Sequence, residues 1–322
     1  MRTALITGIT GQDGLYLAEH LLAQGYEVHG LIRGQQNPKR ALVERVVPDV
    51  KLREGDLLDE VSLRKSFERS APDEVYNLAA ISFVQYSFAN PLLTAQVTGV
   101  STLRLLELVR EAPRTRFYQA STSEMFGLAR ETPQSERTSF HPRSPYAVAK
   151  TFAHHATVNY REAYGLFAVG GILFNHESPR RGVEFVSRKV TRAAAAIKLR
   201  LQSTLELGNL DARRDWGFAG DYVRAMHLML QQQEPSDFVV GTGVTRSVRE
   251  LVAIAFRAAG LRWEEHVVTN EAHMRPADVP ELCADATRAR EILNWRPTVS
   301  FEDLVEMMVE RDLRELGSKV LA

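Results

Sequence analysis

The first half of the chain alternates short apolar runs with longer segments of helical pattern. Apolar or β-branched runs at 4–7, 27–32, 73–79, 116–121 and 166–173 predict buried strands, and 50–52 adds a short third strand. Apolar residues recur at helical spacing over 15–23, 101–110 and 146–164. Strands that alternate with helices indicate βαβ units with right-handed crossovers. We therefore expect an α/β fold built on a doubly wound parallel sheet.

The pattern changes after Asn175. Basic and polar residues dominate 178–214, and a proline-bearing mixed segment runs from 260 to the end, with a helix predicted at 222–230 and a strand at 238–241. We expect a nucleotide-binding domain of residues 1–175 plus about 215–245, and a smaller mixed α/β lobe of residues 176–214 plus about 246–322. Ligands of open α/β sheets bind beyond the carboxyl ends of the strands. The smaller lobe should therefore cover that crevice and bind the substrate.

Composition excludes several classes of function. Of 322 residues 44% are hydrophobic and 25% charged, which is unlike a disordered, collagen-like or disulfide-rich chain. Forty Lys and Arg balance forty Asp and Glu, so no overall charge attracts nucleic acid or an anionic membrane. The chain begins without a signal-peptide pattern, and no stretch approaches the ~20 apolar residues of a membrane span. The single cysteine, Cys283, suits a structural thiol. We expect a soluble, cytoplasmic protein.

Three glycines, Gly8, Gly11 and Gly14, follow the first predicted strand and open the first predicted helix. Such a turn brings backbone N–H groups close to a pyrophosphate at a helix N-terminus. The sequence therefore predicts a Rossmann-type dinucleotide site that contains Gly8, Thr10, Gly11, Gln12, Asp13 and Gly14.

The residues after the second predicted strand indicate which dinucleotide binds. An NAD enzyme usually carries an acid there to hold the ribose 2′-hydroxyl, but this chain has Arg33, followed by Lys39 and Arg40. An arginine pairs well with a 2′-phosphate, so NADP is favoured over NAD. Asp56 and Leu57, after the third strand, are candidates for contact with the adenine, and a plain loop aspartate is the alternative.

Candidate catalytic residues lie at the end of one strand and the start of the next helix. Tyr146 and Lys150 are four residues apart and share a helix face. A phenol has a pKa of about 10, and a neighbouring ammonium is expected to lower it so that Tyr146 works as a base. Thr122 offers a hydroxyl to the reacting oxygen. Glu124 offers a second proton-transfer group, which suggests removal of a carbon-bound proton, although an ordinary loop acid is the alternative.

Six stretches carry a resemblance to a known family. They are 6–14 (ITGITGQDG), 118–127 (YQASTSEMFG), 143–150 (RSPYAVAK), 172–182 (ILFNHESPRRG), 214–217 (RDWG) and 275–278 (RPAD). In these the chain resembles the extended short-chain dehydrogenase/reductases and, more narrowly, the GDP-mannose 4,6-dehydratase family, over essentially its whole length.

The resemblance implies a reaction and a set of roles. Tyr146 would take the proton of the sugar C4 hydroxyl with help from Thr122, while NADP⁺ accepts the C4 hydride. Glu124 would remove the C5 proton as the C6 hydroxyl leaves as water, and the hydride returns to C6. Lys150 would also hold the nicotinamide ribose. Further implied cofactor contacts are Leu78, Ala79, Ala80 and Arg180. Implied contacts to the GDP-sugar are Ser82, Asn175, Glu177, Lys189, Arg214, Arg275 and Asp278.

The same comparison leaves alternatives open. The family pattern has glutamine where this chain has Ile81, and residues 33–38 lack the arginine-serine-rich run that supports 2′-phosphate binding and the tetramer. A homodimer or a dimer of dimers is therefore expected. Rival functions are a GDP-manno-heptose 4,6-dehydratase, a 4-keto-sugar reductase or epimerase, or a non-catalytic NADP-binding protein. No metal is expected, because His154 and His155 are adjacent and face different directions on a helix.

Overall fold

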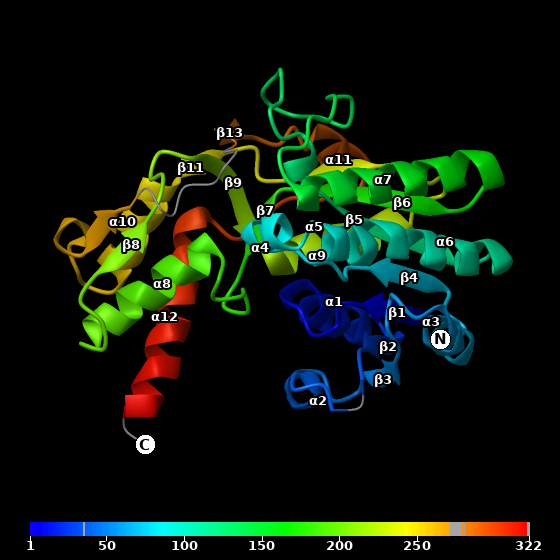
Figure 1. The fold of residues 1–322 in the computed structure, drawn as a ribbon, viewed down its shortest axis with the longest axis horizontal. Helices are drawn as coiled ribbons and strands as arrows, with labels where there is room; N and C mark the ends of the chain where they lie inside the picture. The colour runs from blue at the N-terminus through cyan, green and yellow to red at the C-terminus, as the bar shows by residue number, and fades with distance from the viewer. Residues whose placement is uncertain (35, 271–278, 280, 321–322) are drawn as a thin grey trace.

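A parallel sheet organises the larger part of the protein in our computed structural model, which describes residues 1–34, 36–270, 279 and 281–320 (Figure 1). The strand order is β10-β6-β5-β4-β1-β2-β3, and every neighbouring pair is parallel. The strands are β1 (Thr3–Thr7), β2 (Glu27–Ile32), β3 (Lys51–Glu54), β4 (Glu74–Asn77), β5 (Arg116–Thr122), β6 (Ala168–Leu173) and β10 (Phe238–Val240). The α/β fold with a doubly wound parallel sheet is confirmed.

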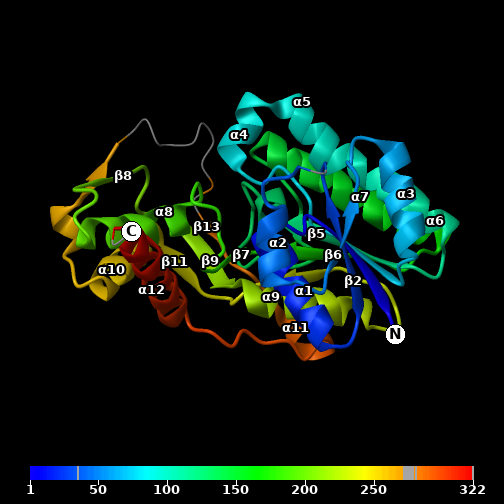
Figure 2. The same cartoon turned by 90° about the horizontal axis from the view of Figure 1, so that it is seen from below.

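Helices cover both faces of this sheet (Figure 2). One face packs against α1 (Gln12–Ala23) and α9 (Ala219–Leu230), with α2 (Arg40–Val46) and α11 (Thr287–Ile292) at its ends. The other packs against α3 (Glu60–Ser70), α6 (Ser101–Glu111) and α7 (Pro145–Tyr164). Burial on both faces explains why the strands have continuous apolar sequences, since every residue of β6 is buried.

Before α6 the chain forms three short elements: α4 (Val84–Ala89), α5 (Pro91–Thr94) and the π-helical η1 (Ala95–Val100). Because α5, η1 and α6 follow one another without a break, Pro91–Glu111 is long and apolar enough by composition to span a membrane, alone among the described residues. This segment is not continuously apolar, because it contains Arg104, Glu107 and Arg110, so it does not contradict the expectation that no stretch approaches ~20 apolar residues. Half of the segment is buried, and it packs against α7.

A second apolar core lies in the smaller lobe, at the left of Figure 1. There β9 (Arg213–Phe218) pairs with β7 (Asn175–Glu177), β11 (Thr245–Ser247) and β13 (Glu281–Leu282), while β8 (Leu205–Leu207) pairs with β12 (Val267–Thr269). The helices α8 (Val186–Lys198), α10 (Val248–Ala258) and α12 (Phe301–Val320) and the short η3 (Trp263–Glu265) complete the lobe. The domain boundaries expected from the sequence stay a prediction.

Candidate active site

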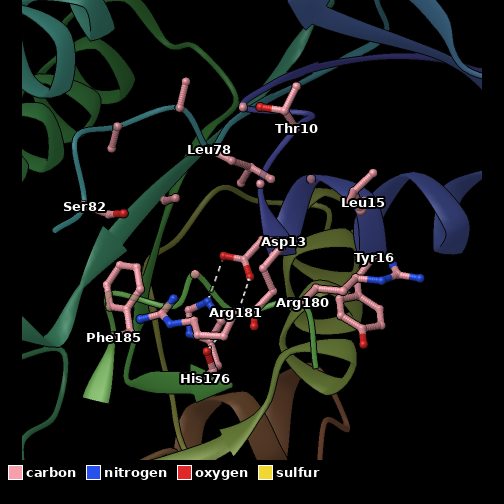
Figure 3. Close-up of a pocket in the computed structure, with 18 of the residues that line it drawn as sticks. Thr10, Asp13, Leu15, Tyr16, Leu78, Ser82, His176, Arg180, Arg181 and Phe185 are labelled. Atoms are coloured by element: carbon pink, nitrogen blue, oxygen red, sulfur yellow. Dashed lines mark hydrogen bonds and ion pairs between the residues drawn. The ribbon is translucent and has the colours of Figure 1, made fainter. Parts of the chain in front are cut away.

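A cleft of about 1290 Å³ opens at the carboxyl ends of β1, β4, β5 and β6. Its lining residues come from these strand ends on one side and from α8 and α12 of the smaller lobe on the other. The position is the one expected for a ligand of a doubly wound sheet. Figure 3 shows the part of the cleft around the start of α1.

Two of the three glycines in the turn, Gly8 and Gly14, have no room for a side chain. Gly8 has a φ of +74°, and a Cβ there would lie 2.8 Å from the backbone nitrogen of Ala79. A Cβ on Gly14 would lie 2.4 Å from the carbonyl oxygen of Gly8. Gly11 is the N-cap of α1, and the first N–H groups of a helix have no partner within it. The glycines therefore let the backbone of the turn and the N-terminus of α1 approach a ligand in the cleft closely, which fits a pyrophosphate.

The hydroxyl of Thr7 holds the neighbouring strand end against this turn. It donates to Asn77 Oδ1 at 2.8 Å and accepts from the backbone N–H groups of Leu78 and Ala79, both at 3.1 Å. Leu78, Ala79 and Ala80 line the cleft, as the resemblance implied. Sequence reasoning did not single out Thr7, whose role depends on the pairing of β1 with β4.

Basic residues gather at the end of the cleft beyond β2. Arg33, Lys39 and Arg45 line it together with Asp56 and Leu57. The Asp56 carboxylate accepts from the backbone N–H of Leu58 at 2.9 Å, so it also shapes its own turn. This end of the cleft therefore carries cations suited to a phosphate.

The four predicted catalytic residues all line the cleft. Thr122 ends β5, and its hydroxyl accepts from the backbone N–H of Glu124, which lies in the short helix η2 (Ser123–Met125). Tyr146 and Lys150 occupy the first turns of α7. The hydroxyl of Thr122 also makes a hydrogen bond with the phenol of Tyr146. Segments far apart in the sequence thus converge on one point.

The expectation that Lys150 lowers the pKa of Tyr146 is wrong for this structure. Burial raises the pKa of Tyr146 to about 12, and the hydrogen bond from Thr122 only partly offsets it. The Lys150 ammonium lies 6.0 Å from the centre of the phenol ring and donates instead to the carbonyl of Ala120 at 2.6 Å. Burial lowers the pKa of Lys150 to about 8, although Asp13 acts in the opposite direction. Tyr146 is therefore a protonated phenol at neutral pH in the ligand-free site.

An ion pair that the sequence did not predict lies beside the glycine turn (Figure 3). His176 Nε2 donates to Asp13 Oδ2 at 2.8 Å, and its Nδ1 donates to the carbonyl of Phe174 at 2.7 Å. Burial raises the pKa of Asp13, but the adjacent His176 outweighs it and holds that pKa below its ordinary value. Burial lowers the pKa of His176, but Asp13 raises it above its ordinary value. The two residues lie 163 positions apart, so only the tertiary fold brings them together.

The remaining predicted residues lie in different surroundings. Arg180 lines the cleft, makes a two-bond ion pair with Glu19 at 2.7 and 2.8 Å, and stacks over the ring of Tyr16. Ser82 and Asn175 also line the cleft, as does Ile81. The described lining residues do not include Glu177, Lys189 or Arg214. Arg275 and Asp278 lie outside the described residues.

Those three residues have partners in the smaller lobe. Glu177 is buried and pairs with Arg181 at 3.0 Å and with the hydroxyl of Ser187. Lys189 donates to the carbonyl of Glu206 at 2.7 Å. Arg214 is buried within β9 and donates to the carbonyl of Arg213 at 2.8 Å. A role for them in substrate binding stays a prediction.

Helices of the smaller lobe add arginines that sequence reasoning missed: Arg188, Arg192, Arg311 and Arg314. The three-residue spacing of Arg311 and Arg314, which places both on one helix face, was the sequence feature that could have identified them as a basic surface. Ten lysines or arginines and five acids are among the described residues that line the cleft, although the chain as a whole is neutral. The cleft therefore favours a polyanionic ligand. Among the described residues, no cluster of three or more His, Cys, Asp or Glu is arranged to hold a metal ion.

Comparison with known proteins decides the family. A family model described as GDP-mannose 4,6 dehydratase matches residues 5–308. The chain belongs to the GDP-mannose 4,6-dehydratase family. It is 53% identical to GDP-mannose 4,6 dehydratase 1 of Arabidopsis thaliana, over 100% of this chain and 92% of that protein. It is 48% identical to the human GDP-mannose 4,6 dehydratase, over 96% of this chain and 91% of that protein.

Solved structures of related enzymes share the fold of this dehydratase family member. The UDP-glucose 4-epimerase of Thermus thermophilus, solved with NAD, is 28% identical and superposes with a TM-score of 0.85 over 97% of this chain and 99% of that one. A dTDP-glucose 4,6-dehydratase of Streptomyces venezuelae, solved with NAD bound, is 25% identical with a TM-score of 0.85, over 99% and 98%. The resemblance to the extended short-chain dehydrogenase/reductases is thereby confirmed.

Proposed function

We propose that this chain is a GDP-mannose 4,6-dehydratase, which converts GDP-mannose to GDP-4-keto-6-deoxy-mannose and water. The observation that carries the proposal is the convergence of Thr122, Glu124, Tyr146 and Lys150 on one cleft beside the glycine turn. A plain alcohol dehydrogenase needs one proton-transfer group at the carbinol. The carboxylate of Glu124 supplies a second one, which elimination of water requires.

A nicotinamide cofactor suits the glycine turn. The turn has no room for a Cβ at Gly8 or Gly14 and leaves backbone N–H groups facing the cleft. A nicotinamide held there would supply a reversible hydride acceptor, which would take the hydride of C4 and give it back at C6 and would therefore be regenerated in each turnover. Leu78, Ala79 and Ala80 would line its site, and Lys150 would hold its nicotinamide ribose.

Each protein residue then has one task. The phenol of Tyr146, hydrogen-bonded to Thr122, exchanges a proton with the C4 oxygen of the sugar. A pKa of about 12 in the ligand-free site must fall for this step, and the positive charge of an oxidised nicotinamide favours that change. Glu124 removes the proton on C5, which the neighbouring ketone has made acidic, and passes it to the C6 hydroxyl, which leaves as water. C5 takes up a new proton when the hydride returns to C6, and this uptake balances the proton that the C4 hydroxyl gave up to Tyr146.

We infer that the cofactor is NADP rather than NAD. The inference is supported by Arg33, Lys39 and Arg45, which line the same end of the cleft with no acid directly after β2. Replacing Arg33 by alanine should weaken binding of NADP by about 10- to 100-fold and leave binding of NAD nearly unchanged, because one charge-assisted contact contributes about 1.5–3 kcal/mol. Equal losses for both cofactors would contradict the inference.

The proposed substrate is a sugar linked to GDP. Ser82 and Asn175, together with the lining arginines, are suited to a diphosphate and a sugar, and Lys189, Arg214, Arg275 and Asp278 remain candidates. Ile81 lines the cleft where the family pattern has a glutamine. This departure favours including GDP-manno-heptose as a second candidate substrate.

The deciding experiment is incubation of the NADP-loaded protein with a panel of GDP-, UDP-, CDP- and dTDP-sugars, scored by loss of one water in the mass spectrum. GDP-mannose should lose water without accumulation of NADPH, and deuterium placed at C4 should appear at C6 of the product. Steady accumulation of NADPH would instead indicate a plain dehydrogenase.

A matched pair of variants tests the role of Glu124. Glu124→Gln should abolish water loss while some oxidation at C4 remains, because the amide cannot accept the C5 proton. Glu131→Gln, in the loop that follows, is the control, since Glu131 is not among the lining residues and hydrogen-bonds with Thr138. Unchanged turnover in Glu124→Gln would remove this residue from the mechanism.

We further propose that the protein forms a homodimer through α4, α5 and α7. These neighbouring helices expose large apolar side chains, among them Leu92 at 81%, Val148 at 55%, Phe152 at 46% and Tyr86 at 44%. Light scattering should give the mass of a dimer or of a pair of dimers for the wild type and a smaller species for Phe152→Glu. A monomeric wild type would contradict this proposal. A cytoplasmic location stays a prediction.

A further inference from the structure

The helix that carries Tyr146 and Lys150 presents a third residue on the same face. His154 follows Lys150 by four positions, as Lys150 follows Tyr146, so the three side chains form one stripe along α7. All three are buried. The stripe faces the last residues of β5, since α7 packs against that strand. The mechanism gives no task to His154.

Each residue of the stripe contacts β5 near its end. Tyr146 is hydrogen-bonded to Thr122, and the Lys150 ammonium donates to the carbonyl of Ala120 at 2.6 Å. The ring nitrogen Nδ1 of His154 lies 2.9 Å from Oγ of Ser121. Three successive residues of β5 are thus bound by three successive turns of α7.

The surroundings of His154 leave its ring little freedom. It is 5% exposed, and a Cβ on Gly170 of the next strand would lie 2.8 Å from its Nδ1. The ring of Phe140 stands edge-on to it, with ring centres 5.3 Å apart. Burial lowers the pKa of His154 to about 4, so the imidazole is neutral at physiological pH and is held by a hydrogen bond rather than by an ion pair.

We propose that His154 and Ser121 are positioning residues that set the register of α7 against β5. The proposal rests on the dehydratase function proposed above. The hydrogen bond at Ser121 lies one residue from Thr122, whose hydroxyl must meet both the phenol of Tyr146 and the reacting oxygen. Without this bond, α7 can shift or rotate slightly on the sheet, and the phenol then leaves its position opposite the C4 hydroxyl. A displacement of about 1 Å is enough to slow a positioned reaction by about 10²-fold.

The test compares Ser121→Ala, His154→Leu, the double variant and His154→Asn with the wild type. His154→Asn places an amide oxygen or nitrogen near the position of Nδ1 and should retain the bond to Ser121. His155→Leu is the matched control: His155 is the adjacent histidine of α7, is exposed and packs against Phe140 and His154. The hydrogen bond to Ser121 is made by His154, so the control variant changes the ring packing and keeps that bond. The kcat and KM for GDP-mannose and the free energy of unfolding are measured for each protein.

We expect kcat to fall about tenfold or more in Ser121→Ala and in His154→Leu, with KM within about twofold of the wild type. The double variant should be no slower than the slower single variant, because both remove one interaction. His154→Asn should recover most of the lost kcat, and His155→Leu should match the wild type.

The proposal would be overturned if the loss of kcat in the double variant equalled the product of the losses in the two single variants. It would also be overturned if the single variants were less stable than the wild type but had the same kcat. A wild type that is inactive on every nucleotide-sugar would overturn the proposed function instead. In that case the same cycle measured on the free energy of unfolding still tests the pair, and a coupling energy near zero would refute it.

Discussion

Replacing Lys150 by methionine should stabilise the ligand-free protein at neutral pH while abolishing turnover. Burial is the main cause that lowers the pKa of this lysine from 10.5 to about 8. At about 1.4 kcal/mol per pH unit, keeping its ammonium charged in the fold costs about 3 kcal/mol. Methionine has a similar length and no charge, so it removes this cost. Enzymes often retain active-site residues that lower the stability of the folded protein.

The pH dependence of the stability difference between Lys150→Met and the wild type distinguishes the cost of burying the ammonium from other effects of the substitution. Between pH 8 and 10.5 the unfolded chain holds a proton on Lys150 that the folded protein has released, so the stability of the wild type rises with pH relative to the variant. The contribution of the buried charge to the difference between Lys150→Met and the wild type should therefore fall from about 3 kcal/mol at pH 7 to about 2 kcal/mol at pH 9 and below about 1 kcal/mol at pH 10. Loss of the hydrogen bond to Ala120 subtracts about 1–3 kcal/mol at every pH, so the net advantage of the variant at pH 7 is about 0–2 kcal/mol and its fall with pH is unchanged.

Urea unfolding at several pH values, without cofactor, measures both proteins. Lys198→Met is the control: Lys198 lies on α8 and is exposed, so the stability of this variant should run parallel to that of the wild type. A difference between Lys150→Met and wild type that stays constant from pH 7 to pH 10 would refute the argument from burial, whatever its size.

Three further changes test other parts of the structure. Gly14→Ala places a Cβ 2.4 Å from the carbonyl oxygen of Gly8 and should cost about 1–3 kcal/mol in urea unfolding, with weaker binding of the cofactor; normal binding would show that the turn relaxes. Asp312→Ala leaves Arg188 buried without its main partner, 2.7 Å away, and should cost about 3–5 kcal/mol; a loss below about 1 kcal/mol would mean that Glu315 compensates. Asp13→Asn should lower the pKa of His176 in an NMR titration, because Asp13 raises it, and an unchanged value would refute the ion pair.

Local patterns in the sequence determined the framework of this protein. The strand at 27–32 and the helices at 15–23 and 146–164 were predicted to within a few residues, because each is a continuous apolar run or a helical stripe between turn signals. The glycine turn and the spacing of Tyr146 and Lys150 were visible for the same reason, since a strand-turn-helix unit and one helix face are local features. Strand alternation also predicted the parallel sheet, and therefore the edge at which ligands bind.

Only the tertiary structure decided what lies beside these residues. No local pattern indicates that His176 meets Asp13 across 163 positions, that His154 meets Ser121, or that Arg311 and Arg314 of the last helix line the same cleft. The predicted direction of the pKa shift of Tyr146 was wrong, because Lys150 donates to the carbonyl of Ala120 and because the phenol is buried. Burial and pairing depend on which surfaces the fold brings together, and a chain pattern read over a few turns does not contain that information.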